Sequence, residues 1–336
     1  MTNDKLQAGV IGSGLIGTQH ARSYDEHPGV DLAAVVDLDE DRAREVAERF
    51  HAASFGSVPE ALDAIDLDLV TVATPESAHL DPTRTVLDRD VDVLLEKPIA
   101  DTVADAEAIG EAVEASEADL LVGYVCRFDP RYANLKSRID DGDFGEFLGI
   151  QAARIASAES YEAVAEWTNP LYYLSVHDID MMRWYLDSEV TEVSAIASRG
   201  LGDLSTPAVV TATLQFANGA VGTLETGWAR PDGYPAAITE EIRLTGTDGY
   251  ARLELENDDV AVGTDEGYDY VDTSELRGTL TTNLTRETAH FVDCVRSGDS
   301  PLVTWRDGLR SLQVANAVLE AIDTGEPVPV PEPGDA

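Results

Sequence analysis

The chain has 336 residues, 43% of them hydrophobic, which is typical of a folded globular protein long enough for two domains. Its 64 acidic and 23 basic residues give a formal charge of −41, and this charge excludes nucleic-acid binding, which needs a basic surface. The acidic residues are spread along the whole sequence, which is typical of a protein adapted to a salt-rich cytoplasm, where molar salt shortens the Debye length to roughly 3 Å.

The longest apolar runs have the length of strands, and the opening segment MTNDKLQAG has no hydrophobic targeting core. We therefore expect a cytoplasmic protein without a membrane partner. Cys126 and Cys294 are too few for a disulfide or metal framework, and the histidines lack metal-ligand spacing, so we expect no metal.

The first third of the sequence alternates short apolar runs with amphipathic stretches, which predicts a doubly wound parallel sheet with crossover helices in a domain over 1–125. Beginning with a strand, the expected strands and helices alternate over 6–12, 17–27, 30–37, 40–50, 67–75, 80–90, 91–98, 101–117 and 119–128.

After Phe128 the strands no longer alternate with helices. Asn218-Gly219 and Asp248-Gly249 stand between alternating runs and predict hairpin turns. We expect an α+β domain over 126–325, with a mostly antiparallel sheet and helices on one face, and then a proline-rich tail over 326–336. Its predicted helices cover 129–142, 171–186, 284–298 and 307–325, and its first strand covers 147–157.

Gly12, Gly14 and Gly17 form a G-x-G-x-x-G motif between the first strand and its helix. The first glycine allows a tight turn, the second lets a pyrophosphate approach the backbone, and the third lets helix and strand pack closely. Asp37 ends the second strand, where a carboxylate would bind the ribose hydroxyls of adenosine. The alternative is a plain turn followed by a loop, but the spacing favours a dinucleotide site.

Asp37 also bears on the choice of cofactor. Its negative charge would repel a 2′-phosphate, and neither Leu38 nor Asp39 offers compensation. Arg42 could swing towards the phosphate. The sequence therefore favours NAD, with NADP not excluded.

Lys97 follows a buried strand in the segment VDVLLEKPIA, in a chain with only two other lysines, Lys5 and Lys136. Ligands of a doubly wound sheet bind at the carboxyl ends of its strands, so Lys97 is expected near the nicotinamide, where its ammonium can stabilise a developing oxyanion. Glu96 either supports Lys97 or contacts the cofactor, and Pro98 fixes the chain direction, with a cis bond as one way to do so. A surface salt bridge between Glu96 and Lys97 is the alternative.

The motifs G-x-G-x-x-G, ATPESAH, EKP and HDIDMMRW, in this order and spacing, resemble the glucose–fructose oxidoreductase and inositol dehydrogenase family, Gfo/Idh/MocA. The resemblance covers nearly the whole chain. It implies a Rossmann domain with an open-faced α/β domain, and NAD(P)-dependent oxidoreduction at a CH–OH group of a sugar, sugar acid or cyclitol. It matches Lys97 to the active-site lysine of the family, and implies a homodimer or homotetramer built through the open sheet face.

The segment Leu171–Leu186 is predicted to be one amphipathic helix that places Tyr173 one turn before His177. The resemblance implies that His177 is catalytic, and we expect it to be the general base because histidine titrates near neutral pH. The family usually has aspartate where this chain has Tyr173, so the substitution changes the catalytic group. A histidine satisfied inside a domain interface is the alternative for His177.

Three further residues are candidates. His79 is expected near the cofactor, with an ordinary helix-start histidine as the alternative. Arg127 is expected to bind substrate or to form an ion pair, and Trp167 is expected to stack on a sugar or to pack in the core. The predicted cofactor contacts are Gly12, Ser13, Gly14, Leu15, Ile16, Gly17, Asp37, Thr74, Pro75, His79, Glu96 and Lys97. The predicted substrate contacts are Lys97, Arg127, Trp167, Tyr173 and His177, and the predicted catalytic residues are Lys97, Tyr173 and His177.

Two other functions fit the same fold. In one, oxidation and re-reduction within one site drive hydrolysis, elimination or epimerisation, and no NADH is released. In the other, the protein is a non-catalytic sugar sensor.

Overall fold

The structure of the protein is a computed structural model that describes residues 5–157, 164, 167–198, 206–231, 238–256, 261–264, 267–270 and 274–332. The chain forms two compact units. One comprises Met1–Phe128 with Ser274–Leu309, and the other comprises Asp129–Thr273 with Arg310–Ala336. The first unit thus includes the late segment Ser274–Leu309. The predicted domain boundaries placed this segment in the second domain, over 126–325.

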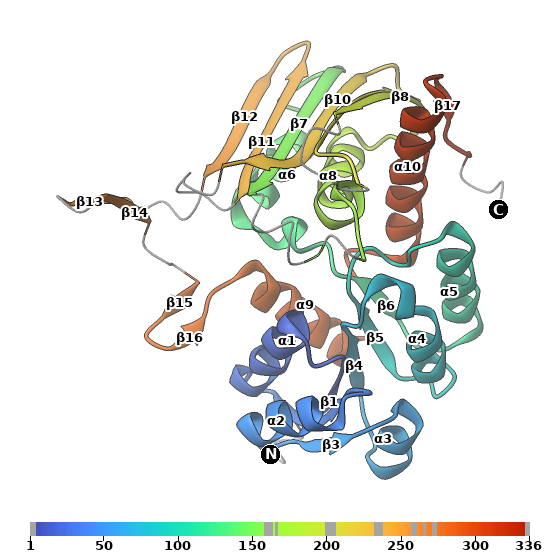
Figure 1. The fold of residues 1–336 in the computed structure, drawn as a ribbon, viewed down its shortest axis with the longest axis vertical. Coiled ribbons are helices and arrows are strands. Elements are labelled where there is room, and N and C mark those ends of the chain that lie inside the picture. The colour runs from blue at the N-terminus through green and yellow to red at the C-terminus, as the bar shows by residue number, and fades with distance from the viewer. Residues whose placement is uncertain are drawn as a thin grey trace. The chain divides into compact units, whose positions relative to one another are not determined.

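The first unit contains a six-stranded sheet in the order β3-β2-β1-β4-β5-β6, and every neighbouring pair is parallel (Figure 1). This is the doubly wound Rossmann order, and it confirms the predicted fold class. Its strands are β1 Leu6–Ile11, β2 Val30–Val36, β3 Ala53–Phe55, β4 Leu69–Val72, β5 Asp92–Leu95 and β6 Leu120–Val122. Its helices between strands are α1 Leu15–Glu26, α2 Glu40–Phe50, α3 Val58–Ala64, α4 Leu80–Leu87 and α5 Val103–Ala115.

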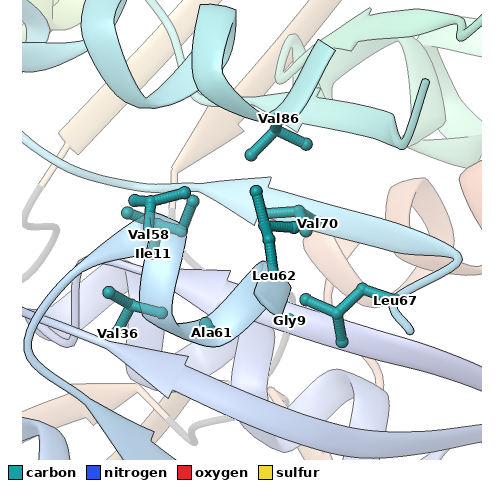
Figure 2. A pocket seen from close by; sticks show the side chains of 9 residues that line it. All are labelled: Gly9, Ile11, Val36, Val58, Ala61, Leu62, Leu67, Val70 and Val86. Atoms are coloured by element: carbon teal, nitrogen blue, oxygen red, sulfur yellow. The ribbon is translucent and has the colours of Figure 1, made fainter. Parts of the chain in front are cut away.

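The buried strands explain the near-continuous apolar runs of this unit, because helices cover both faces of a parallel sheet. All four residues of β4 are buried, as are three of the four residues of β5. Figure 2 shows a pocket between this sheet and the helices beside it, and its lining offers no side-chain hydrogen-bonding group. It is lined by Gly9, Ile11, Val36, Val58, Ala61, Leu62, Leu67, Val70 and Val86.

The last predicted strand of this unit, over 119–128, is shorter in the structure. β6 ends at Val122, and a 3₁₀ helix, η2, covers Val125–Phe128. The chain turns there because the amide of Tyr124 bonds the carbonyl of Val122, and the amide of Arg127 bonds that of Tyr124. The late segment completes the unit with α9 Asn283–Ser297, which packs on α1, and a short hairpin of β15 Glu275–Leu276 and β16 Thr279–Leu280.

The second unit contains a seven-stranded sheet in the order β12-β11-β7-β10-β9-β8-β17. Only the β7–β10 pair is parallel, so the sheet is mixed and mostly antiparallel, as predicted. Its strands are β7 Phe147–Ser157, β8 Val190–Ser198, β9 Val209–Phe216, β10 Val221–Arg230, β11 Ile238–Gly246, β12 Tyr250–Glu256 and β17 Val328–Pro329, and β13 Ala261–Thr264 pairs separately with β14 Gly267–Tyr270.

Both predicted hairpins form. Gly219, with φ of +89°, turns the chain between β9 and β10, a conformation that favours glycine. Asp248 and Gly249 join β11 to β12. The helices beside this sheet in Figure 1 are α6 Pro130–Asp140, α8 Val176–Leu186 and α10 Trp305–Thr324. α8 packs on β7, and its Met182 side chain lies close to Gly222 of β10.

Candidate cofactor and active site

The carboxyl ends of β2, β1, β4 and β5 meet at one edge of the first sheet. Ile11 pairs with Val72 and Val72 pairs with Leu95, so the residues that follow these strands lie side by side. The predicted cofactor residues come from the four loops at this edge. Parallel topology alone therefore gathers residues that are more than eighty positions apart in sequence.

The glycine loop joins β1 to α1. Gly12 has φ of +91°, and a Cβ there would lie 2.6 Å from the Ala73 carbonyl oxygen. A Cβ on Gly17 would lie 1.7 Å from the Gly12 carbonyl oxygen. Both glycines are thus required by the fold of the loop itself. A Cβ on Gly14, in contrast, meets nothing within 4 Å.

The open space at Gly14 fits a dinucleotide. No side chain caps α1 at Gly14, and no acidic residue lies in its first turn, so this helix end presents backbone N–H groups and the positive end of its dipole. Leu15 and Ile16, at the start of this helix, are 76% and 39% exposed. A bound pyrophosphate would accept hydrogen bonds from the free N–H groups of this helix end.

Asp37 follows β2 and accepts hydrogen bonds at both oxygens. Oδ2 accepts from the backbone N–H and the hydroxyl of Ser13, each at 2.8 Å, and Oδ1 accepts from the amide of Asp39 at 2.9 Å. Burial opposes ionisation of Asp37, but these bonds and nearby Arg42 outweigh it and lower its pKa. Asp37 is therefore an ionised acceptor tied directly to the glycine loop.

Thr74, Pro75 and His79 follow β4. The His79 ring is buried, with Nε2 2.8 Å from the Thr74 carbonyl oxygen and Nδ1 3.3 Å from that of Ile99. Burial lowers the pKa of His79 despite these two acceptors. His79 thus holds the loop after β4 against the loop after β5, the two loops that the sequence predicts to contact the cofactor.

Lys97 follows β5 as a half-buried residue, and its peptide bond to Pro98 is cis. Glu96 is buried, and its Oε1 lies 2.9 Å from Nε2 of His20 while its Oε2 accepts from the backbone N–H of Lys97 at 3.1 Å. Burial raises the pKa of a carboxyl, yet His20 and Lys97 lower that of Glu96 below its ordinary value. Glu96 therefore supports the backbone of Lys97.

Arg127, at the end of the first unit, is only 5% exposed. Its guanidinium donates to the Leu302 carbonyl oxygen at 3.2 Å and to Asp307 at 2.9 Å. These contacts correspond to the ion pair that was the alternative to a substrate-binding role.

The predicted helix over Leu171–Leu186 is interrupted. A π-helical turn, η3, covers Leu171–Ser175, and the amide of Val176, the first residue of α8, donates to the carbonyl of Leu171. Asn169 initiates this turn, since its side-chain oxygen accepts from the amides of Leu171 and Tyr172. Such turns are rare and often occur at functional sites.

Tyr173 lies in the π-turn and His177 in the first turn of α8, where it is 8% exposed. The Tyr173 ring contacts Trp167 edge to face at 6.2 Å and Trp228 at 5.5 Å. Trp228 is fully buried, whereas Trp167 is 50% exposed. Tyr173 is therefore held between a core aromatic and an exposed one.

A buried ionic network beside His177 was not predicted. Asp178 accepts two bonds from Nε of Arg154, at 3.1 and 3.0 Å, and one from Nη2 at 3.0 Å, and Arg154 also pairs with Glu240. Burial raises the pKa of Asp178 in spite of Arg154. The HDID motif carries Asp178, but its partner lies on β7, and no local spacing could have identified it.

No group of three or more histidine, cysteine, aspartate or glutamate side chains among the described residues is arranged to hold a metal ion. None of the helices described here combines the length and hydrophobicity needed to cross a bilayer.

Comparison with known proteins places both units in one family. Residues 6–124 match the model of the oxidoreductase family with an NAD-binding Rossmann fold, and residues 136–330 match that of its C-terminal α/β domain. The chain belongs to the GFO_IDH_MocA oxidoreductase family. The family resemblance drawn from the motifs is confirmed, and the protein is an NAD-dependent oxidoreductase.

Several relatives are named as inositol dehydrogenases. The chain is 28% identical to the scyllo-inositol 2-dehydrogenase (NAD(+)) of Bacillus subtilis over 96% of both chains. It is 31% identical to inositol 2-dehydrogenase 4 of Saccharopolyspora erythraea, over 67% of this chain and 68% of the relative.

The solved structure of scyllo-inositol dehydrogenase from Lactobacillus casei superposes with a TM-score of 0.86 at 23% identity, over 98% of this chain and 99% of the other. At that identity the likeness confirms the fold alone.

Proposed function

We propose that the protein oxidises a secondary hydroxyl of a cyclitol, with sugars and sugar acids as the wider substrate class, and passes the hydride to NAD. The observation that carries this proposal is the position of Lys97. It is the second residue after β5, at the sheet edge that holds the glycine loop and Asp37, all within one unit. Support for the substrate class comes from relatives named as inositol 2-dehydrogenases.

Lys97, His177 and Tyr173 form the proposed catalytic group. The Lys97 ammonium donates a hydrogen bond to the substrate oxygen and stabilises negative charge on it as the C–H bond breaks. His177 takes the hydroxyl proton as general base, so the carbinol becomes a ketone. Bound NAD supplies the acceptor for the hydride. Tyr173 is proposed to orient the substrate through its hydroxyl.

The proposed substrate contacts are Lys97, Arg127, Trp167, Tyr173 and His177. Trp167 is suited to stack on the C–H face of a cyclitol because half of its surface is exposed beside Tyr173. Arg127 would bind substrate only if one of its N–H groups donated to the substrate in place of Asp307.

The proposed cofactor contacts remain the glycine loop with Ser13, Leu15 and Ile16, together with Asp37, Thr74, Pro75, His79, Glu96 and Lys97. Ser13 donates to Oδ2 of Asp37, and Oδ1, which accepts from the amide of Asp39, can accept a further hydrogen bond from a ribose hydroxyl. His79 would act indirectly, by holding together the loops after β4 and β5 that contact the cofactor.

The direct test is a panel of inositol isomers, sugars and sugar acids with NAD or NADP in concentrated potassium chloride, read by the absorbance of reduced nicotinamide. We expect NAD-dependent reduction with at least one inositol. Product formation without net NADH would instead indicate the redox-cycling function, and binding without turnover would indicate a sensor. A preference for NADP would contradict the role of Asp37.

We also propose a homo-oligomer that assembles through the outward face of the second sheet, in a salt-rich cytoplasm. Ile196, Val221 and Tyr250 are 75%, 60% and 63% exposed on strands of this sheet. Large exposed apolar residues on a sheet face favour association. Sedimentation in concentrated potassium chloride should give a dimer or tetramer, and Val221→Glu should shift it towards the monomer.

A further inference from the structure

A buried cluster of ionisable groups lies beneath the start of the Lys97 loop. His20 and Tyr24 are four residues apart on α1, so they share one helix face, and both are fully buried. The Tyr24 hydroxyl lies 2.7 Å from Oγ1 of Thr71 on β4. Next to them Glu96 contacts His20, and α9 packs on α1 from the late segment of the same unit (Figure 1).

Glu287 of α9 faces this cluster and is also fully buried. Neither of its carboxyl oxygens has a hydrogen-bond partner among the described residues. Burial, and then the negative charge of Glu96, raise the pKa of Glu287 well above its ordinary value, and burial is likewise the main cause of the raised pKa of Tyr24. Two carboxyl groups that interact in a buried site cannot both ionise without a large cost.

His20 decides which of the two groups carries the charge. The pKa of Glu96 is lowered, so Glu96 is ionised and only accepts hydrogen bonds, and Nε2–H of His20 therefore donates to its Oε1 at 2.9 Å. The backbone N–H of Lys97 donates to the other oxygen. Glu96 thus has two donors and Glu287 has none within the described residues, so the charge lies on Glu96 and the proton on Glu287.

We propose that His20 is a positioning residue for Lys97, and that Glu287 stays neutral, so that the single negative charge of this cluster lies on Glu96 directly beside Lys97. Through that charge His20 holds the backbone of Lys97 and keeps its ammonium protonated. The charged and titratable groups that face Glu96 are His20 on α1, Lys97 on its own loop, His79 before α4 and Glu287 on α9. This inference rests on the proposed function only where it predicts effects on turnover.

The first test does not depend on turnover. The infrared spectrum of the wild-type protein minus that of Glu287→Gln, in concentrated potassium chloride near neutral pH, should show the C=O stretch of a protonated carboxyl, which shifts in D₂O. Glutamine has the size of the neutral acid and cannot ionise. Absence of that band would overturn the proposal, whereas its presence without dehydrogenase activity would overturn the proposed function alone.

The second test is the pH profile of kcat/KM. In His20→Leu, Glu96 loses its donor and takes up a proton more readily, so Lys97 should deprotonate at lower pH and the alkaline limit of activity should fall by about one pH unit. His20→Gln should restore the profile, because its amide N–H can donate to Glu96. Glu287→Gln should leave the limit unchanged.

A merely structural role for His20 would lower the stability of the His20→Leu variant without moving the alkaline limit, and that result contradicts the proposal. A limit that moves in Glu287→Gln would contradict it as well, because Glu287 would then carry a charge in the wild-type protein. NAD affinity, measured by calorimetry on each variant, should remain within twofold of the wild type.

Discussion

The two units position their proposed functional residues by different means. In the first unit, the glycine loop, Asp37, Thr74 and Lys97 each follow a strand of a parallel sheet, and topology alone brings them to one edge. In the second unit the antiparallel strands alternate direction, and Tyr173 and His177 lie instead on a covering helix interrupted by a π-turn. The parallel sheet thus gathers the proposed cofactor residues from distant loops, whereas the mostly antiparallel sheet carries Tyr173 and His177 on a helix that covers it.

The largest expected effect tests the strand-end site. Lys97→Met removes the ammonium and keeps an unbranched side chain of similar length, so kcat should fall at least about a hundredfold because the developing oxyanion loses its donor. NAD affinity, measured by calorimetry, should stay nearly unchanged. Lys136→Met is the matched control, since Lys136 pairs with Asp140 on a surface helix. Turnover near the wild-type value in Lys97→Met would remove Lys97 from the mechanism.

Two glycines of the loop differ in the space around them, so substituting each with alanine should have different effects on stability and on NAD affinity. Gly17→Ala forces a Cβ against the Gly12 carbonyl oxygen and should destabilise the fold by about 3 kcal/mol or more. Gly14→Ala meets nothing within 4 Å, so its unfolding free energy should match the wild type.

NAD affinity should nevertheless fall at least about tenfold in Gly14→Ala, which corresponds to about 1.4 kcal/mol. Denaturant unfolding and calorimetry separate the two variants. Unaltered NAD affinity in Gly14→Ala would place the pyrophosphate elsewhere.

Glu287 gives the first unit a distinctive pH dependence of stability. Its pKa is raised in the folded state, so the fold retains a proton that the unfolded chain releases above its own pKa of about 4.5. Stability should therefore fall as pH rises from that value towards the folded pKa, by up to about 1.4 kcal/mol per pH unit.

Glu287→Gln should lack this contribution, so its advantage in unfolding free energy over the wild type should grow with pH through the same window. Urea unfolding at several pH values in concentrated potassium chloride measures this difference. Parallel curves for the two proteins would contradict a buried neutral acid.

The smallest expected effect concerns Tyr173, in the π-turn before α8. Tyr173→Phe keeps the ring between Trp167 and Trp228 and removes only the hydroxyl, so stability should hold while kcat/KM for the best inositol falls up to about tenfold, the value of one hydrogen bond. Trp167→Phe should raise KM without changing kcat, because stacking binds substrate and transition state alike. An unchanged kcat/KM in Tyr173→Phe would show that the Tyr173 hydroxyl does not orient the substrate and that the ring serves only in packing.

Local patterns predicted most elements of both units. α2 and β7 have the bounds that the sequence indicates, because each has a clear period and a clear end. β3 and α3 were not predicted, since the three residues of β3 are too few to show alternation and the seven residues of α3 form only about two helical turns. The π-turn was not predicted either, because hydrophobic periodicity cannot distinguish one π-turn from a continuous α-helix.

The glycine loop could be predicted because it lies in a few adjacent residues, and the cis bond at Pro98, which the sequence offered as one possibility, is present. The partners of Arg127, Asp178 and Glu96 were not, since Asp307, Arg154 and His20 are brought to them by the fold across long sequence separations. Local sequence indicates which groups are available, and tertiary structure decides how they pair.

The central claim is that Lys97 of the first unit and His177 of the second act on one substrate hydroxyl. A crystal structure of the dead-end complex with NADH and the best inositol from the panel tests it most directly. The account predicts one inositol oxygen within about 3.2 Å of both Lys97 Nζ and a ring nitrogen of His177. Lys97 and His177 bound to different groups, with no shared substrate oxygen, would contradict it.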